Sequence, residues 1–524
     1  MAPERVDAIC IVGGGDAGLL VALALDQGVP ETDITVVDDF AESVPEVGKS
    51  TLYYLVDFLH NTLGIDPSHL FAEVDIAWKT TVYFEDWCGV EPFHSPLGNT
   101  LPIVDQRNKT SESTSLADRR TVPRDRATIS GRNARVFDEF YYRYQQQNFE
   151  TMYGEIAETP GKTPLVVDPD NVFDVTKGLP DVAYHFNSRS LNRFLRELCR
   201  ERGITLVDDR IDRVDTDNDR IRRPHGQTDT YTADLYVDAS GFRRLLMTAL
   251  GNELQPFDLP VDAALVTTTD IDLSEVTSAT VITSADAGWC WQIDTYEVRD
   301  LGYVYSTDHI TTSDAREEFI ATRPELEADT TCNHYTFDSG VLGTPWMNNC
   351  VAVGNAAGFV EPLQSTALTT SALTADRIAA GLGKHGRYNH AGLRDLFNDV
   401  THTTWDEVYR FISLYYKYAS GDTPFWTDAN DINPEPTPQY QTYQASAFTA
   451  PEDYFRFTRT AADLNNYYLY YLILRELGVD SEFYESLDHE VDPEIPKIVD
   501  EHTASLPEKV EQYLSYEEFE HGFG

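Results

Sequence analysis

Short apolar runs alternate with glycine-rich and polar turns at the start of the chain. Residues 6–12 are mostly apolar and predict a buried strand, and residues 13–18 form a glycine-rich turn. Residues 19–27, rich in Ala and Leu, predict a helix, and residues 34–38 (ITVVD) predict a second strand. The order strand, turn, helix, strand is typical of a βαβ unit with parallel strands.

Further along the chain, periodicity alternates between helical and extended segments. The pattern predicts helices over residues 52–63 and 190–202, and mainly helical structure from about residue 371 to the end. It predicts a strand over residues 78–87, a strand pair over 204–214 and a strand ending in a turn over 234–241. It predicts β-rich segments over residues 264–282 and 289–307, and a short buried strand over 351–354. Aromatic residues at 467–471 form a stripe that is more typical of a core than of a ligand site.

Residues 94–135 are polar, rich in Arg, and show no hydrophobic period. A structureless stretch of this length in a compact domain is usually a functional lid or a disordered segment. Its arginines suit the phosphates of a flavin cofactor, but the composition favours a solvated loop. The sequence therefore predicts a long loop or lid.

Length and charge narrow the class of protein. A chain of 524 residues is too long for one simple core, so two or more lobes are expected. The net charge of −47, from 87 acidic and 40 basic residues, disfavours binding to nucleic acids or anionic membranes. Acidic residues are spread through the chain and only nine residues are Lys, which favours a salt-rich cytoplasm over an ordinary acidic protein.

The spacing of the cysteines and the sequence of the N-terminus indicate in which cellular compartment the protein is expected. The six cysteines are widely spaced and form no Cys-x-x-Cys pair, so neither a disulfide framework nor a zinc site is expected. The chain begins without a signal-peptide pattern, and no apolar run reaches the roughly 18 residues that a membrane helix needs. We therefore expect a soluble, cytoplasmic protein.

The turn at residues 13–18 (GGGDAG) fits the dinucleotide fingerprint Gly-x-Gly-x-x-Gly. Gly13, Gly15 and Gly18 would allow a tight turn and close approach of a pyrophosphate to the helix N-terminus, where Ala17 also lies. Asp38, at the end of the second strand, would bind a ribose hydroxyl. The motif predicts FAD or NAD(P), although Asp16 places an anion beside the phosphate.

A competing motif lies at residues 48–51 (GKST), which ends like a phosphate-binding P-loop. The first glycine of that motif would stand at position 43, where the chain has Ser43. The P-loop interpretation is therefore rejected.

Two later segments favour FAD over NAD(P). Residues 234–244 and 354–362 resemble the strand–turn segments that close over FAD in the glutathione-reductase-like flavoproteins. The resemblance predicts a cofactor-binding set beyond the first turn. It consists of Gly48, Lys49, Asp238, Gly241, Gly354, Asn355 and Phe359.

The segment GWCWQI at residues 288–293 places Trp289 and Trp291 on one face of a strand. Together with the fingerprint and residues 354–366 (GNAAGFVEPLQST), it resembles the flavin-dependent halogenase family, whose best-known members chlorinate tryptophan. Residues 302–306, 405–407 and 422–426 also match the family, so the likeness runs through nearly the whole chain. Asp294 stands where the family has proline.

The resemblance assigns roles to particular residues. Residues 78–87 align with the family strand that carries the essential lysine, which places Lys79 at that position. The amine would hold hypohalous acid by hydrogen bonds or become an N-haloamine, and then deliver halogen to an aromatic ring. Trp289 and Trp291 would shield substrate from flavin. Thr366 and Ala367 would bind halide through their backbone.

Three further departures from the family are visible. Gln364 replaces the glutamate that orients the lysine and stabilises the cationic ring, and a neutral hydrogen bond is weaker than one to a charge. Ala367 replaces a glycine, which restricts φ without removing the N–H. Lys49 replaces a glutamate on the loop that moves with flavin binding. The substrate is therefore expected to be tryptophan, another indole, or a more electron-rich ring such as a phenol.

The predicted fold is α/β, with a glutathione-reductase-like (Rossmann-type) FAD-binding lobe, an inserted β-rich substrate lobe and a helical C-terminal region. The FAD-binding lobe is assigned to residues 1–60, 160–260 and 340–380. The substrate-binding lobe is assigned to residues 61–159, 261–339 and 381–524, the last of these carrying the helical part.

The predicted activity is halogenation with FADH₂, O₂ and chloride or bromide. A separate flavin reductase would supply FADH₂ by diffusion, and the aromatic substrate would be free or bound to a carrier protein. The resemblance is also compatible with a homodimer. Two alternatives remain open at this point: an FAD-dependent monooxygenase that hydroxylates an aromatic ring, and a flavin-binding protein without catalytic activity.

Overall fold

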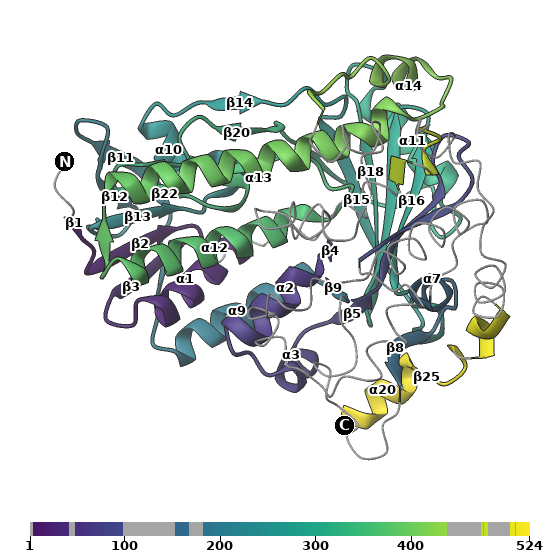
Figure 1. Ribbon diagram of the computed structural model, residues 1–524, viewed down its shortest axis with the longest axis horizontal. Helices are drawn as coiled ribbons and strands as arrows, with labels where there is room; N and C mark the ends of the chain where they lie inside the picture. The colour runs from purple at the N-terminus through teal and green to yellow at the C-terminus, as the bar shows by residue number, and fades with distance from the viewer. Residues whose placement is uncertain are drawn as a thin grey trace, which may run out of the picture. The chain divides into compact units, whose positions relative to one another are not determined.

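The computed structural model describes residues 4–40, 48–97, 152–166, 182–436, 473–474, 476–479, 504–508 and 510–523 (Figure 1). The chain divides into two compact units. Unit 1 comprises residues 1–76, 184–269 and 300–409, and unit 2 comprises residues 77–183, 270–299 and 410–524. Most of the predicted loop at 94–135 and the aromatic stripe at 467–471 lie outside the described residues.

Unit 1 is built on a six-stranded sheet in the order β10-β3-β2-β13-β22-β21. The first five of these strands are parallel, and β21 pairs antiparallel with β22. Apolar runs such as AICIV in β2 are almost wholly buried, as expected for parallel strands that are covered on both faces. The strands span Ala8–Val12 (β2), Asp33–Asp38 (β3), Thr205–Asp208 (β10), Leu235–Asp238 (β13), Trp346–Met347 (β21) and Cys350–Ala352 (β22).

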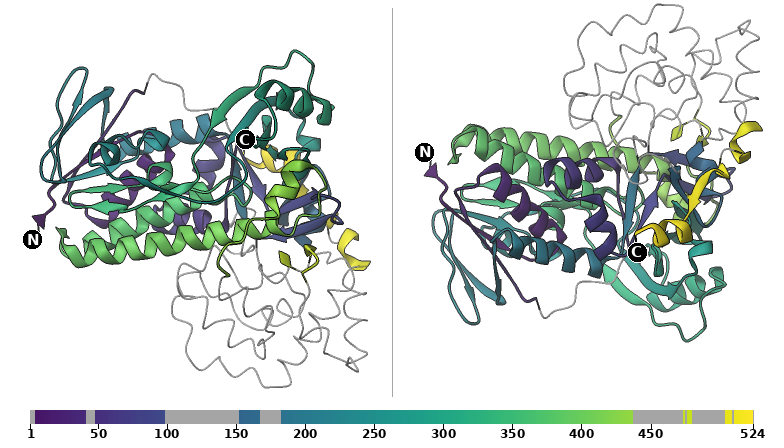
Figure 2. Two further views of the ribbon diagram at one scale, coloured as in Figure 1. Left: turned by 90° about the horizontal axis from the view of Figure 1, so that it is seen from above. Right: turned by 90° about the horizontal axis from the view of Figure 1, so that it is seen from below.

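Helices α1 (Asp16–Gly28) and α12 (Thr366–Lys384) run alongside each other in unit 1 (Figures 1 and 2). Small residues allow this close approach: a Cβ on Gly28 would lie 2.9 Å from the Cβ of Ala379. Helix α9 (Ser188–Glu201), which Asn187 caps, also packs on α1. The N-termini of α1 and α12, both predicted to bind anions, therefore belong to one packed layer.

The other elements lie outside that sheet and helix layer. Within unit 1 they are β1 (Glu4–Arg5), β4 (Lys49–Ser50), α2 (Tyr53–Asp57), η1 (Phe58–Thr62), α3 (Pro67–Glu73), β11 (Ile211–Thr216), β12 (Ile221–Gly226), η3 (Gly241–Arg243), α10 (Leu245–Ala249), β14 (Leu254–Pro256), α11 (Thr312–Thr322), β19 (Asn333–Thr336), β20 (Gly340–Leu342), η5 (Gly354–Ala356), β23 (Gly358–Phe359) and β24 (Tyr388–Asn389). Five elements cross a unit boundary along the chain: β5 (Ile76–Lys79), β9 (Ala183–Phe186), β15 (Ala263–Asp270), β18 (Val298–Tyr305) and α13 (Ala391–Lys417).

Unit 2 contains four adjacent strands in the order β17-β16-β6-β7. Their bounds are Gly288–Asp294 (β17), Ala279–Ala285 (β16), Thr81–Asp86 (β6) and Phe93–Pro96 (β7). Strand β6 is parallel to β16, and the other two pairs are antiparallel. Among the described residues of unit 2, the other elements are α7 (Met152–Ala157), β8 (Lys162–Val166), η4 (Leu273–Glu275), α14 (Pro424–Ala429), β25 (Tyr513–Ser515) and α20 (Tyr516–Phe523).

Two sequence predictions need correction. The strand expected over residues 78–87 is two strands, β5 and β6, because Thr80 turns its N–H and Oγ1 to the carbonyl oxygen of Ser278 at 2.8 and 3.1 Å. The helix expected over residues 52–63 is α-helical only to Asp57 and continues as the π-helix η1.

The compact units divide the chain differently from the two predicted lobes. Residues 61–76, 261–269, 300–339 and 381–409, which the sequence analysis assigned to the substrate lobe, belong to unit 1. Residues 160–183, assigned to the FAD lobe, belong to unit 2. The division by bound ligand stays a prediction.

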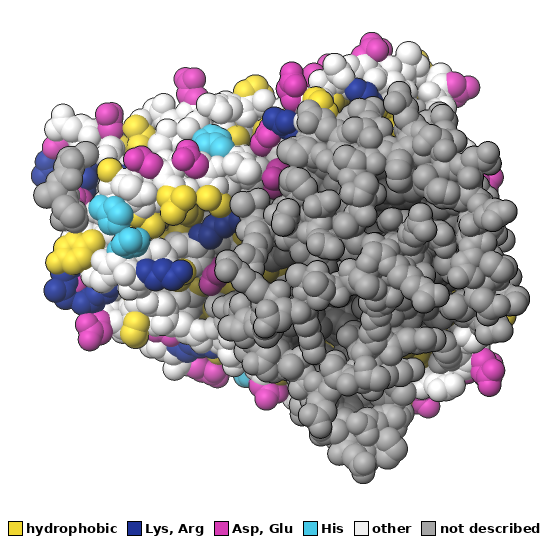
Figure 3. Space-filling view, viewed as in Figure 1, with side chains coloured by type: hydrophobic (Ala, Val, Ile, Leu, Met, Phe, Trp, Pro, Cys, Tyr) yellow, Lys and Arg dark blue, Asp and Glu magenta, His cyan; other side chains and the backbone are white. Residues whose placement is uncertain are grey.

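On the face shown in Figure 3, acidic side chains are dispersed among neutral and basic ones rather than gathered in one patch. This distribution agrees with an acidity that is spread along the sequence.

Candidate active site

The fingerprint turn follows β2 and requires its glycines. Gly13 has a φ of +114°, and a Cβ there would lie 2.2 Å from the carbonyl oxygen of Ala239. A Cβ on Gly18 would lie 2.1 Å from the carbonyl oxygen of Gly13, whereas one on Gly15 would meet no atom within 4 Å. The turn is therefore tight on its inner side and open at Gly15. This cradle fits a pyrophosphate at the N-terminus of α1.

Asp38 lies at the end of β3, where the sequence predicts a ribose-binding acid. Its Oδ2 accepts a hydrogen bond of 2.9 Å from the backbone N–H of Gly14. Burial raises the pKa of Asp38, against the lowering effects of that bond and of Arg243 and Arg196. The carboxylate is therefore fixed on the fingerprint turn, and its contact with ribose stays a prediction.

Asp16, the anion that looked out of place in the fingerprint, is held by two partners. Asn192 of α9 donates its Nδ2 to Oδ1 of Asp16 at 2.9 Å, and to the carbonyl oxygen of Gly14 at 3.1 Å. Lys49 Nζ lies 3.2 Å from Oδ2 of Asp16. Sequence analysis did not predict this contact, and it missed Asn192 entirely.

The loop after β13 is folded around Asp238. This carboxylate is fully buried and accepts hydrogen bonds from Ser240 and from the backbone N–H groups of Leu246 and Met247, at 2.8 and 2.9 Å for the last two. Burial raises the pKa of Asp238 despite these bonds. The loop presents Gly241, where a Cβ would meet no atom within 4 Å. A ligand can therefore approach the backbone of Gly241.

The third turn, after β22, packs directly on the first. Gly354 has a φ of +57°, and a Cβ there would lie 2.7 Å from the Cβ of Ala17. Asn355 lies in η5 beside it, and Phe359 follows in β23. The Phe359 ring contacts Phe242, on the loop after β13, at a centroid distance of 5.2 Å. The turns after β2, β13 and β22 thus meet at the carboxyl edge of one parallel sheet, where α/β folds bind their ligands.

The predicted halide site is the N-terminus of α12. Helix α12 begins at Thr366, and the Ser365 side chain makes no capping hydrogen bond. Backbone N–H groups of a first helical turn lack partners within the helix and favour anions. The left-handed residue is Ser365, with a φ of +58°, whereas Ala367 is helical. The restriction on φ expected from alanine at 367 therefore costs nothing, and Gln364 lies buried just before the strained residue.

Residues 48–52 connect the predicted pyrophosphate and halide sites. A Cβ on Gly48 would lie 2.6 Å from Asp300, and Lys49 pairs with Asp16. The backbone N–H of Leu52 donates to Oγ1 of Thr369, one helical turn after Thr366, at 3.2 Å. The segment is therefore fixed at its two ends to the dinucleotide turn and to α12.

Lys79 is the last residue of β5 and belongs to unit 2. Its side chain is 0% exposed, and this burial lowers the pKa of the amine to about 7. Burial disfavours the charged form because an ammonium group loses its hydration. Near neutral pH, the amine is therefore present in both protonation states.

The tryptophans of β17 form a tilted pair with ring centroids 6.0 Å apart. Trp289 is 1% exposed and donates its Nε1–H to the hydroxyl oxygen of Tyr416 at 2.9 Å. Trp291 is 5% exposed, and its Nε1 has no hydrogen-bond partner among the described residues. Tyr416 was missed from the sequence, because nothing there indicates that the residue faces a strand more than a hundred positions earlier.

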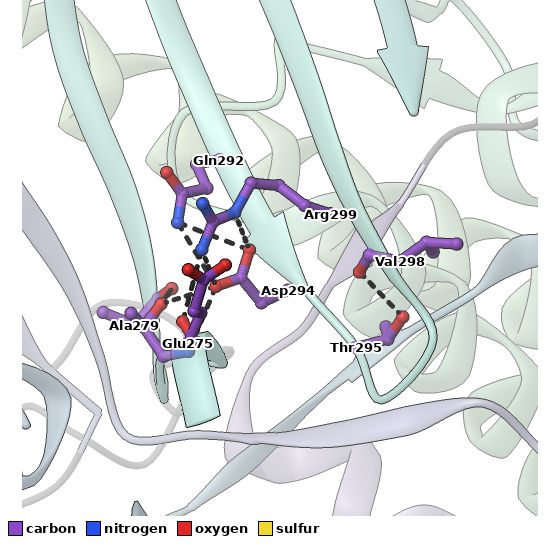
Figure 4. A network of polar contacts seen from close by, with 8 residues as sticks. Glu275, Ala279, Gln292, Asp294, Thr295, Val298 and Arg299 are labelled. Carbon is purple, nitrogen blue, oxygen red and sulfur yellow. Dashed lines mark hydrogen bonds and ion pairs between the residues drawn. The ribbon is translucent and has the colours of Figure 1, made fainter. Parts of the chain in front are cut away.

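Asp294, which stands where the halogenase family has proline, is the last residue of β17 and the centre of a network of polar contacts (Figure 4). It is fully buried and takes hydrogen bonds from Arg299, Nε at 2.8 Å and Nη2 at 3.0 Å. Gln292 and Thr277 donate to the same carboxylate. Arg299 also reaches the carbonyl oxygen of Glu275 at 3.2 Å. The network fixes the strand that carries the two tryptophans.

The predicted residues fall into two groups. Lys79, Trp289 and Trp291 belong to unit 2, and all the predicted cofactor and halide residues, together with Gln364, belong to unit 1. Among the described ranges, no cluster of three or more His, Cys, Asp or Glu side chains could hold a metal ion. In the same part of the chain, no helix is long and apolar enough to cross a membrane.

A parallel sheet whose turns after β2, β13 and β22 meet at its carboxyl edge is typical of a dinucleotide-binding α/β lobe of Rossmann type. A model of the tryptophan halogenase family matches residues 8–493. The chain therefore belongs to the tryptophan halogenase family, and it is a flavin-dependent halogenase, an oxidoreductase that uses FAD and halide.

Similar proteins cover nearly the whole chain. Tryptophan 6-halogenase SttH of Streptomyces toxytricini is 28% identical over 459 residues, which are 82% of each chain. Tryptophan 7-halogenase RebH of Lentzea aerocolonigenes is 27% identical over 522 residues, 91% of this chain and 90% of the relative. Among solved structures, MibH, a lathipeptide tryptophan 5-halogenase, is 26% identical with a TM-score of 0.76. The match covers 97% of this chain and 92% of the MibH chain. These similarities confirm the predicted family and α/β fold.

Proposed function

We propose that this halogenase acts on an electron-rich aromatic small molecule and that Lys79 delivers the halogen. The observation that carries the proposal is the complete burial of Lys79, which lowers the pKa of its amine to about 7. An ordinary lysine is almost entirely protonated near neutral pH and cannot accept a halogen. A substantial neutral fraction makes Lys79 a nucleophile under those conditions.

Reduced FAD, together with O₂, supplies the oxidising power that converts halide into hypohalous acid. The neutral amine of Lys79 then takes the halogen: an N–halogen bond forms, the O–halogen bond breaks, and water leaves. A ring carbon of the substrate attacks the halogen, the amine regains its proton, and the ring loses one. In the ammonium form, Lys79 would instead hold hypohalous acid by donating hydrogen bonds.

The other residues support that step by binding and exclusion. The N-terminus of α12 at Thr366 and Ala367 would concentrate halide, because unsatisfied N–H groups and the helix dipole favour an anion. The turns at Gly13–Gly18, Gly241 and Gly354 would hold FAD. Trp289 and Trp291 would keep substrate away from the flavin ring, with Trp289 held by its bond to Tyr416.

We infer further that a separate flavin reductase delivers the reduced cofactor by diffusion. The substrate class is proposed as indole, tryptophan or a phenol, free or attached to a carrier. The named relatives act on tryptophan. Gln364, in place of the family's glutamate, would stabilise a ring cation less well, which supports a more electron-rich ring.

The test is a product assay with FAD, a flavin reductase, NADH, O₂ and chloride or bromide, offered indoles and phenols and read by mass spectrometry. A halogen isotope pattern that requires wild-type Lys79 and survives Lys384→Ala, a change at an exposed lysine, supports the proposal. Gain of one oxygen without dependence on halide would instead indicate an aromatic monooxygenase.

A further inference from the structure

Two unusual residues of the cofactor region contact each other. Asp16 puts a carboxylate in the first turn of α1, at the place where a dinucleotide phosphate binds. Lys49 stands on β4, where the family has glutamate. The two are 33 positions apart, and Lys49 Nζ lies 3.2 Å from Asp16 Oδ2. The lysine therefore supplies a positive charge at the point where the fingerprint has a negative one.

The carboxylate of Asp16 is fixed, whereas the ammonium group of Lys49 has room to move. Asp16 is 3% exposed in its side chain, and Asn192 anchors its Oδ1. Arg196 in turn donates its Nε to Oδ1 of Asn192 at 2.6 Å. The Lys49 side chain is 32% exposed.

The backbone beneath Lys49 is fixed. Strand β4 pairs with β9 through Lys49 and Phe186, Asp300 crowds Gly48, and Leu52 bonds to Thr369. A change of partner by Lys49 therefore needs only rotation of its flexible side chain. No movement of the segment is required.

Binding of a pyrophosphate beside Asp16 requires a positive charge such as that of Lys49. A pyrophosphate carries two negative charges, and this chain has a net charge of −47. A buried carboxylate at the same helix N-terminus repels the phosphate and competes with it for the helix dipole. Only nine residues of the chain are lysines, and one of them lies within ion-pair distance of this acid.

We propose that Lys49 is shared between two anions and that Asp16 thereby sets the affinity for FAD. Without cofactor, Lys49 neutralises Asp16. With cofactor, its ammonium group turns to the pyrophosphate, and Asp16 opposes binding by competing for the lysine and by repelling the phosphate. The proposal rests on FAD binding at the Gly13–Gly18 turn, which belongs to the proposed function.

The proposal predicts changes of opposite sign for the two partners. Asp16→Asn keeps the shape of the side chain and removes the competing charge, so FAD binds about tenfold more tightly. Lys49→Gln removes the shared cation, so FAD binds about tenfold more weakly. Lys49→Arg keeps the charge and stays within about threefold of wild type.

Binding is measured by quenching of flavin fluorescence on titration of oxidised FAD, with no turnover involved. ADP, which carries a pyrophosphate but no flavin ring, is titrated calorimetrically and shows the same opposite shifts. Glu31→Gln is the matched control. Glu31 also pairs with a basic residue, Arg387 at 3.0 Å, but lies beyond the far end of α1, and its change alters net charge equally without altering FAD affinity.

Thermal unfolding of each variant without ligand separates loss of fold from loss of affinity. If Asp16→Asn folds and binds FAD and ADP no more tightly than wild type, the pair only stabilises the fold and the proposal is overturned. If Asp16→Asn does not fold, the comparison of Lys49→Gln with Lys49→Arg decides the outcome. Equal affinities of these two variants for FAD would overturn the proposal. Wild type that binds neither FAD nor ADP overturns the proposed cofactor site itself.

Discussion

The two lysines predicted to act in halogenation and in cofactor binding, Lys79 and Lys49, differ in burial and in the charge beside them. Lys79 is completely buried on a strand of unit 2, and burial lowers the pKa of its amine to about 7. Lys49, in unit 1, is one-third exposed and lies against the carboxylate of Asp16. Burial makes the first lysine a reactive amine, whereas a carboxylate and water make the second a counter-charge. The two proposals thus assign the same kind of side chain to bond formation in unit 2 and to anion recognition in unit 1.

The largest expected effect comes from changing Lys79. Lys79→Ala removes the amine and should lower halogenated product by about 100-fold or more, while FAD affinity stays unchanged. Lys79→Arg sharpens the comparison, because guanidinium keeps a positive charge but is not deprotonated in proteins. If the reaction needs a neutral amine, Lys79→Arg should lose halogenation as Lys79→Ala does. Lys49→Arg, in contrast, should keep its affinity for FAD. Product measured by mass spectrometry and FAD titration together check this, and an active Lys79→Arg enzyme would refute the amine mechanism.

The pH dependence tests the protonation state directly. Halogenation by wild type should rise about tenfold for each pH unit below the pKa of Lys79 and level off above about 7. Lys49→Gln should shift FAD affinity and leave that inflection unchanged. Rates are compared at saturating FAD from pH 5.5 to 9. A rate that instead falls as pH rises through 7 would show that the protonated, ammonium form of Lys79 is the active one.

Folding stability should report the same pKa with a defined sign. The unfolded chain keeps the Lys79 proton up to its ordinary pKa of 10.5, while the folded protein releases it near 7. The unfolded state therefore binds more protons between these values, and the stability of wild type rises with pH across that window. Lys79→Met lacks the group, so its stability relative to wild type should be greatest below pH 7, decrease across the window, and become constant above 10.5. Denaturant unfolding at several pH values measures this difference, and a constant difference would contradict it.

Much of the backbone geometry of the candidate cofactor site could be predicted from the sequence, because its parts are local. The strand, the glycine turn and the helix at residues 6–27 follow from periodicity, and Gly13 and Gly354 have the positive φ angles that glycine allows. Lys79 was found through its family strand, but its burial was not visible in the sequence. Contacts between distant segments could not be predicted either. The Asp16–Lys49 pair depends on β4 pairing with β9, and the bond from Trp289 to Tyr416 depends on how a helix packs on a strand.

A third charged group, Asp294, extends the comparison: its side chain is as buried as that of Lys79, and it forms an ion pair, as Lys49 does. Arg299→Leu removes that partner and leaves a buried carboxylate without its ion pair, which should destabilise the protein by about 3 kcal/mol. Arg299→Leu combined with Asp294→Asn should recover most of that loss. Denaturant unfolding of both variants checks the prediction. Equal stabilities of the single and double variants would show that the network does not depend on charge.

The smallest expected effect concerns Gln364, which is neutral where the family has an acid. Gln364→Glu would add a negative charge to a buried position just before α12, and should raise turnover on indoles a few-fold by stabilising the cationic ring. Burial of the new carboxylate opposes this gain, and so does its repulsion of halide at the helix N-terminus. The KM for halide should therefore rise while kcat on indoles rises. A fall in both kcat and halide affinity would mean that the surroundings of Gln364, unlike those of Lys49 and Asp294, exclude charge.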